Sequence, residues 1–112
     1  MTRKQDRKEI NQTIPVVDVI NGGEFGELIN ITTEGLMVIS DQPRSPHSIF
    51  QLSLQLPTEL EGSLTLELGA DCLWCREATN FNRHWAGLQI IDISDQGLKQ
   101  IEQLILLYSE SE

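Results

Sequence analysis

The sequence predicts a mainly β protein, a small antiparallel barrel or sandwich with one helix at its C-terminal end. Six or seven short apolar runs are separated by turn residues, and several of them alternate apolar and polar side chains, as strands do. After Asp95 the apolar spacing changes to three and four residues, which is the period of a helix. At 112 residues the chain fits one domain with a modest core.

The N-terminal residues differ in composition from the rest, and we expect residues 1–12 to form a flexible basic arm ahead of a single domain over residues 13–112. Residues 1–10 contain four basic and two acidic residues and carry +2, whereas the remainder carries −11. The basic residues of the arm are Arg3, Lys4, Arg7 and Lys8. A solvated tail is the ordinary interpretation of such a charge run, so the arm alone indicates no function.

Strands are expected on both sides of a turn at residues 21–23. Thr13–Ile20 is rich in β-branched residues and predicts the first strand, with Pro15 favouring an edge or a bulge near its start. Phe25–Ser40 then contains two apolar runs joined by Thr33-Glu34-Gly35, which predicts a hairpin.

This hairpin is predicted to carry a small polar surface. Asn30 and Thr32 are two residues apart, so on an extended strand their side chains would point the same way. Gly35 would supply the backbone freedom for the chain to reverse. The hairpin therefore offers amide and hydroxyl groups side by side next to a tight turn.

Four further strands follow from alternating or β-branched runs. They span Ile49–Leu56, Ser63–Leu68, Ala70–Glu77 and His84–Ile93. The polar stretches 41–48, 57–62 and 78–83 are expected to be loops or turns, and Gly69 a bend or a bulge. In the second of these strands Leu64, Leu66 and Leu68 are expected to face inward together.

The helix is predicted over about residues 95–109, with Ser94 or Asp95 capping its start. One face carries the residues at helical spacing: Leu98, Ile101, Leu104, Ile105 and Tyr108. Leu106 and Leu107 widen this apolar face, so the helix either covers a barrel mouth or meets a partner chain. We expect the first.

No arrangement of residues predicts an enzyme or a metal site. Cys72 and Cys75 form a lone CxxC, and His47 and His84 do not complete a zinc ligand set. A pair on a strand would be too far apart for a disulfide, so two reduced thiols are expected, at least one of them packed in the core. A redox protein is a distant alternative, because no helix follows the motif to lower a thiol pKa.

Charge and hydropathy limit the classes of partner that this chain is expected to bind. A formal charge of −9 and a pI near 4.5 argue against a DNA- or RNA-binding protein. No apolar run is long enough to span a membrane and no secretory signal is visible, so a cytoplasmic protein is expected. Trp74 and Trp85 are more often packing residues than stacking platforms, although one on an outer barrel surface could stack on a base.

Two short motifs, taken together, indicate a family. Arg3-Lys4-Gln5-Asp6-Arg7 is followed by Asn30-Ile31-Thr32-Thr33-Glu34-Gly35, and this pair resembles the RxxxR and [D/N]xSxxG motifs of the PilZ domain family. The later strands, with Gly69, Trp74 and Trp85-Ala86-Gly87, and the closing helix also follow that family's order. The resemblance implies a six-stranded antiparallel split barrel with a C-terminal helix, and the ligand cyclic di-GMP.

The resemblance also implies a set of ligand-binding residues. They are Arg3, Arg7, Asn30, Thr32 and Gly35, with Lys4 and Trp74 as further candidates. Arginine can bind phosphate oxygens or guanine O6 and N7 with two donors, and the amide and hydroxyl can bind a guanine edge. The sequence departs from the family pattern at Thr32 in place of serine, at Glu34 before Gly35, and at Lys4 in place of a second arginine.

The expected function is that of a receptor or adaptor, without turnover and without a cofactor. The arm would clamp the dinucleotide against the barrel and so change the surface shown to an unidentified protein partner in motility, attachment or biofilm control. A monomer or weak dimer is expected. The alternative is a PilZ-like protein-interaction module that binds no nucleotide.

Overall fold

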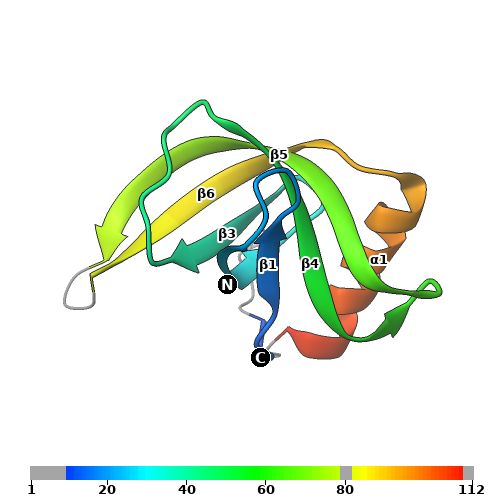
Figure 1. The fold of residues 1–112 in the computed structure, drawn as a ribbon. Coiled ribbons are helices and arrows are strands. Elements are labelled where there is room, and N and C mark those ends of the chain that lie inside the picture. Colours follow the sequence, from blue (N-terminus) through cyan, green and yellow to red (C-terminus); the bar gives the residue numbers. More distant parts are fainter. Residues whose placement is uncertain (1–9, 79–81, 110–112) are drawn as a thin grey trace, which may run out of the picture.

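The structure, a computed structural model, describes residues 10–78 and 82–109. The chain forms six strands and one helix in the order that the sequence predicts (Figure 1). They are β1 (Pro15–Asp18), β2 (Glu24–Ile31), β3 (Gly35–Ser40), β4 (Ile49–Leu60), β5 (Ser63–Ala78), β6 (Arg83–Asp92) and α1 (Asp95–Tyr108). No helix within the described residues is both long enough and apolar enough to cross a membrane.

The strands close into a barrel in the order β1-β2-β3-β6-β5-β4, and every neighbouring pair is antiparallel. The final pairing, between β1 and β4, joins the two ends of the sheet. Closure gives each strand of the barrel a paired strand on both sides along part of its length, whereas the end of β5, beyond Asp71, pairs with β6 alone. The predicted fold class, a six-stranded antiparallel barrel with a C-terminal helix, is confirmed.

The core fills the barrel and continues under α1. Phe25 is 1% exposed and meets Phe50 edge-on at a ring separation of 4.8 Å. From the helix, Ile101 and Leu104 are fully buried in the same cluster. Figure 1 shows α1 beside β4 and the first part of β5, on the opposite side of the molecule from the end of β5. The helix therefore covers the barrel, as expected from its apolar face.

The start of α1 is capped as predicted. The Ser94 hydroxyl accepts a hydrogen bond from the Gly97 N–H, and Asp95 stands in the first turn, where a negative charge is favourable. At the other end Leu106 is 84% exposed and Leu107 is 56% exposed. The helix thus uses only part of its apolar face for the barrel.

The predicted turn at residues 57–62 is wrong in extent. β4 continues through Pro57 to Leu60, and the chain reverses only at Glu61 and Gly62, whose φ angles are +53° and +78°. The ladder between β4 and β5 is irregular between Gln55 and Leu60, so Pro57 stands where the regular pairing is interrupted. A proline at such a position bends a strand without ending it.

The two predicted strands at residues 63–68 and 70–77 form one strand, β5. Its pairing with β6 shifts between Gly69 and Ala70, which confirms the bulge expected at Gly69. Leu66 and Leu68 face the core as predicted, but Leu64 is 58% exposed, and its predicted inward position is wrong. Leu64 belongs to the tip of the β4–β5 hairpin, which extends past the barrel interior (Figure 1).

The first strand is shorter than the predicted Thr13–Ile20. β1 ends at Asp18 because its carboxylate accepts hydrogen bonds from the Ile20 N–H, the Asn21 N–H and the Asn21 side-chain amide. These contacts fold the following residues into a turn. Val19 and Ile20 are consequently exposed in that turn, although the Val19 N–H still donates to the Gln51 carbonyl oxygen of β4 at 2.9 Å.

A candidate ligand-binding face on the outer wall of the barrel

Four residues that lie far apart in sequence form one row across four strands. Asn30 of β2 is paired with Met37 of β3, Met37 with Gly87 of β6, and Gly87 with Trp74 of β5. Directly paired residues in an antiparallel sheet face the same side. Met37 points outward because its neighbours Leu36 and Val38 are buried in the core. The row therefore lies on the outer wall.

A bulge in β2 places Asn30 in this row. Leu28 is paired with the core residue Val38, and Asn30 with the outward residue Met37, so Ile29 is the extra residue between them. Without that residue Asn30 would share the inward face of Leu28. The bulge thus turns Asn30 toward the outer wall, where the residue is nevertheless buried, with 6% of its surface exposed.

Thr32 organises the turn between β2 and β3. Its hydroxyl accepts hydrogen bonds from the Glu34 N–H (3.1 Å) and the Gly35 N–H (3.2 Å), and it lies 3.4 Å from the Gly35 carbonyl oxygen. The Thr32 N–H also donates to that carbonyl oxygen, at 2.8 Å. The hydroxyl predicted for ligand binding therefore already holds the hairpin turn, in the manner typical of serine and threonine.

Gly35 is required for a different reason from the one predicted. Positive φ angles are found at Gly22, Gly23 and Gly62, and Gly35 does not have one. Instead, a Cβ at Gly35 would lie 2.6 Å from the carbonyl oxygen of Leu88 on β6. The close approach of the two backbones, and not the reversal of the chain, therefore requires glycine here.

Trp74 lies over Gly87, its partner in the row. A Cβ at Gly87 would lie 2.3 Å from Nε1 of Trp74, so the missing side chain makes room for the indole. The Arg76 guanidinium stacks on the same ring, 4.9 Å from its centroid. A groove of about 350 Å³ on the outer wall is lined by Met37, Trp74, Arg76, Glu77, Ala78 and Trp85. Aromatic faces beside a guanidinium suit a planar base next to a phosphate.

The register extends this patch by a second row. Ile39 of β3 is paired with Trp85 of β6, and Trp85 with Arg76 of β5. Trp85 and Arg76 are the site candidates that sequence reasoning did not select. The sequence offered one clue to Trp85: it and Trp74 lie on two consecutive predicted strands, which are neighbours in the barrel. It offered none to Arg76.

The arm residues Arg3, Lys4 and Arg7 lie outside the described residues. The chain enters the described region at Ile10, whose N–H donates to the carbonyl oxygen of Ile29 at 3.0 Å. Ile29 is the bulged residue that immediately precedes Asn30. The C-terminal end of the predicted arm is therefore attached to the barrel next to the polar position of the hairpin.

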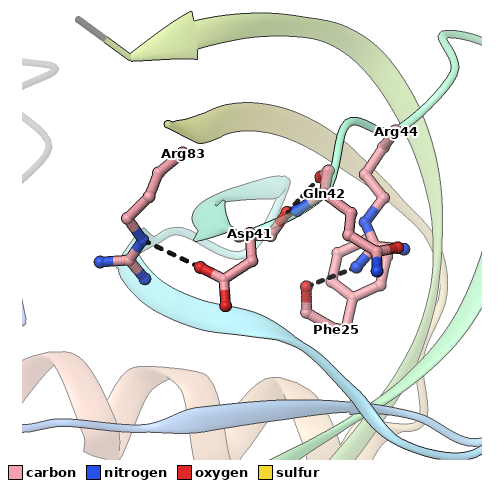
Figure 2. A network of polar contacts seen from close by, with 6 residues as sticks. Phe25, Asp41, Gln42, Arg44 and Arg83 are labelled. Carbon is pink, nitrogen blue, oxygen red and sulfur yellow. Dashed lines mark hydrogen bonds and ion pairs between the residues drawn. The ribbon is translucent and has the colours of Figure 1, made fainter. Parts of the chain in front are cut away.

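A second cavity, of about 370 Å³, lies at the other end of β2 and β3 and contains none of the predicted site residues. Figure 2 shows its two arginines: Arg44 lies over the Phe25 ring, 4.2 Å from the ring centroid, and donates to the Phe25 carbonyl oxygen, while Arg83 faces Asp41 at 3.4 Å. Each guanidinium thus has a protein partner.

Asp18 also lines this cavity. Burial raises the pKa of its carboxyl group, but hydrogen bonds from Asn21 and Ile20 outweigh burial and hold the pKa below its usual value. The Asp18 carboxylate therefore accepts hydrogen bonds that stabilise the β1–β2 turn, and we do not assign it to ligand binding.

Both cysteines are free thiols, as expected. Cys72 is fully buried, and burial raises the pKa of its thiol, so it is a packing residue rather than a nucleophile. The half-buried Cys75 sulfur accepts a hydrogen bond from the Arg44 N–H at 3.3 Å. Within the described residues no cluster of three or more histidine, cysteine or acidic side chains is arranged to hold a metal ion.

A closed six-stranded barrel with one covering helix and a polar and aromatic patch on its outer wall defines a small β-barrel domain. The model of the PilZ domain matches residues 1–107 of this chain. The chain therefore belongs to the PilZ domain family. No curated protein sequence matches the chain.

Solved structures resemble this one in fold at low sequence identity. The inhibitor of motility MotI/DgrA from Bacillus subtilis has a TM-score of 0.72 at 14% identity, over 94% of this chain and 50% of the other. MrkH from K. pneumonia in its apo state has a TM-score of 0.72 at 12% identity, over 95% and 50%.

A third structure contains a ligand. It is PlzA of Borreliella burgdorferi in complex with c-di-GMP, with a TM-score of 0.57 at 11% identity, over 93% of this chain and 51% of the other. The present chain thus spans about half the length of each of these three proteins. At such identities the likeness concerns the fold.

Proposed function

We propose that this PilZ domain is a cyclic di-GMP receptor that binds the dinucleotide on the outer wall, between the arm and the row formed by Asn30, Met37, Gly87 and Trp74. The row is the main observation in support of this binding site, because it brings Asn30 and Trp74, which were predicted separately, onto one face. Three strand spacings separate these two residues, or about 14 Å.

The groups on this face match the chemistry of the ligand. The Asn30 amide can both donate and accept along a guanine edge, and Trp74 offers its outer face for stacking once the Arg76 guanidinium that covers this face moves to a phosphate. Arg76, already stacked on Trp74, places a cation where a phosphate would lie beside the stacked base. Arg3 and Arg7 would bind phosphate or guanine from the opposite side, as arginine does with its two-donor fork.

Ordering the arm makes the receptor a switch. Fixing a flexible segment on a ligand costs about 2 to 5 kcal/mol, which the contacts of the arm must offset. Once ordered, the arm changes the surface that a protein partner meets. Family membership and the PlzA complex support a cytoplasmic receptor or adaptor in motility, attachment or biofilm control, acting without turnover.

Calorimetric titration with cyclic di-GMP tests the proposal. We expect saturable binding that weakens as salt concentration rises, because the arm contributes charge. Arg7→Ala is expected to weaken binding at least about tenfold, which corresponds to the loss of one charged contact of 1.4 kcal/mol or more. Lys99→Ala, which removes an equal charge from the exposed surface of α1, is the matched control and should bind as the wild type does.

Cyclic di-AMP is the matched control ligand. It has the same phosphates but lacks guanine O6, so recognition of the base edge predicts much weaker binding. Absence of saturable heat with folded protein at high micromolar cyclic di-GMP would overturn the proposal. Equal loss of affinity in Arg7→Ala and Lys99→Ala would instead show that net charge, rather than the arm, attracts the ligand.

One observation favours the alternative, a protein-interaction module that binds no nucleotide. The Thr32 hydroxyl and the Gly35 backbone, both elements of the motif, already serve the hairpin turn and the contact with β6. Their presence is therefore explained without a ligand. Failure to bind cyclic di-GMP in the titration above would select this function.

A further inference from the structure

A bulge in β5 lies between the two cysteines. The pairing of β5 with β6 advances by two residues on β5, from Cys72 to Trp74, but by only one residue on β6. Leu73 is therefore the extra residue. On an uninterrupted strand two residues three positions apart point to opposite faces, about 10 Å from each other. An inserted residue changes this, because every residue beyond it turns to the other face.

Both cysteines consequently face the interior of the barrel. Cys72 is paired with Leu88 and Cys75 with Ala86, and both partners are core residues. Directly paired residues of an antiparallel sheet face the same side. Because Leu88 and Ala86 are two residues apart on β6, strand spacing places the Cα atoms of the cysteines opposite them about 6.7 Å apart, within the range found in disulfides.

The Cys72 sulfur lies beside the backbone of Cys75. Cys72 Sγ donates to the Trp74 carbonyl oxygen at 3.5 Å, and this carbonyl belongs to the peptide bond that joins Trp74 to Cys75. Burial, and after it the charge of the nearby Cys75 sulfur, raises the pKa of the Cys72 thiol. Such an effect of one sulfur on the other falls off with distance, so it agrees with two thiols that are close together.

The two thiols differ in their access to solvent. Cys72 is fully buried, whereas Cys75 is half-buried. β4 pairs with β5 only as far as Asp71, and beyond that residue the loop before β4 contacts β5 instead, where the Arg44 N–H donates to the Cys75 sulfur at 3.3 Å. A loop is displaced more easily than a paired strand. Cys75 is therefore the thiol that a reagent in solution meets first.

We propose that Cys72 and Cys75 form a reversible disulfide by exchange with a low-molecular-weight disulfide such as oxidised glutathione. The Cys75 thiolate attacks one sulfur of oxidised glutathione, the S–S bond of that molecule breaks, and one glutathione leaves as a thiolate that takes up a proton. Cys72 cannot attack a reagent in solution because it is buried, but the sulfur of the mixed disulfide lies beside it.

The second step closes the ring. Cys72 gives its proton to water and bonds to the Cys75 sulfur, the mixed disulfide breaks, and the second glutathione leaves as a thiolate that takes up a proton. The protein loses two hydrogen atoms in total, and one oxidised glutathione becomes two glutathione thiols. No nucleotide takes part, so the proposal does not depend on the receptor function.

The ring closed by this disulfide contains Leu73 and Trp74. Trp74 lies over Gly87 and lines the groove on the outer wall, so closing the ring acts on the backbone that positions the indole. The redox state of the two thiols, which face the interior, thereby reaches the outer wall.

Incubation of the full chain with oxidised glutathione, followed by alkylation of the remaining thiols and mass spectrometry, tests the proposal. We expect the folded wild type to lose both thiols, to form one disulfide within the chain and to recover both thiols in dithiothreitol. The indole N–H resonance of Trp74 is expected to shift on oxidation, and a disulfide without this shift would contradict the effect on the groove. The proposal is overturned if both thiols persist, if the reaction stops at a glutathione adduct, if disulfides form only between chains, or if the ring closes only in urea.

Two matched variants test the order of the steps. Cys72→Ala retains the accessible thiol and is expected to stop at the mixed disulfide, with one glutathione on Cys75. Cys75→Ala retains only the buried thiol and is expected to stay unmodified while folded. Circular dichroism verifies the fold of each variant, and the wild-type result decides the proposal if either fails to fold. Equal rates of modification in the two folded variants would overturn the assignment of the first attack to Cys75.

Discussion

At the scale of single residues, Thr32 and Gly35 of the NxTxxG motif have structural roles that could not be predicted from the sequence. The pattern predicted a polar surface at Asn30 and Thr32. The register turns Asn30 toward the outer wall, but the residue is only 6% exposed. Asn30 faces that wall only through the bulge at Ile29, which alternation of side chains could not predict because an inserted residue breaks the two-residue period. The glycine was likewise predicted for the wrong reason: the Leu88 carbonyl oxygen, distant in sequence, sets the requirement.

Gly35→Ala tests this account of the motif. Because the clashing atom is a backbone oxygen at 2.6 Å, the strand must shift, and we expect the free energy of unfolding to fall by about 2 to 3 kcal/mol in chemical denaturation. Gly87→Ala is the comparison, since its clash is with the Trp74 ring, which can swing outward. It should cost less stability but change the tryptophan fluorescence. Equal stability of Gly35→Ala and wild type would refute the close-packing explanation.

At the scale of elements, local patterns predicted strand identity well and strand ends poorly. The predicted turn at residues 57–62 relied on Pro57, but the pairing irregularity of β4 tolerates the proline. The predicted first strand overran because the carboxylate contacts of Asp18 depend on how the next three residues fold. The helix, with its strong period and Ser94 cap, was predicted almost to the residue.

The β1–β2 turn gives a pH-dependent prediction. Since the pKa of Asp18 is lowered in the folded state, its contribution is complete above the unfolded value of about 3.9 and is lost as pH falls through the folded value. Asp18→Asn, which cannot ionise, should be less stable than wild type at pH 6 in urea denaturation. The difference should shrink as pH falls below about 4. A difference independent of pH would contradict the role of the charged form.

At the scale of the whole molecule, the order of strands in the barrel brings together residues that are far apart in the sequence. β2 and β3 carry the motif, and β6 then β5 follow them around the barrel, so Trp74 joins Asn30 in one row. The sequence supplied both residues as candidates, but only the strand pairings β2–β3, β3–β6 and β6–β5 show that they share a face. Trp85 and Arg76 were missed for the same reason, since strand neighbours cannot be deduced from order in the chain.

The most direct test of the receptor account is a nuclear magnetic resonance titration of the folded protein with cyclic di-GMP, following backbone amides. We expect saturable shifts at residues 30–35, at Trp74 and at Gly87, and in the arm at residues 3–8. Gly22 and Gly23, at the second cavity, should not move. Saturable shifts confined to Gly22 and Gly23, with Asn30 and Trp74 unchanged, would contradict the account.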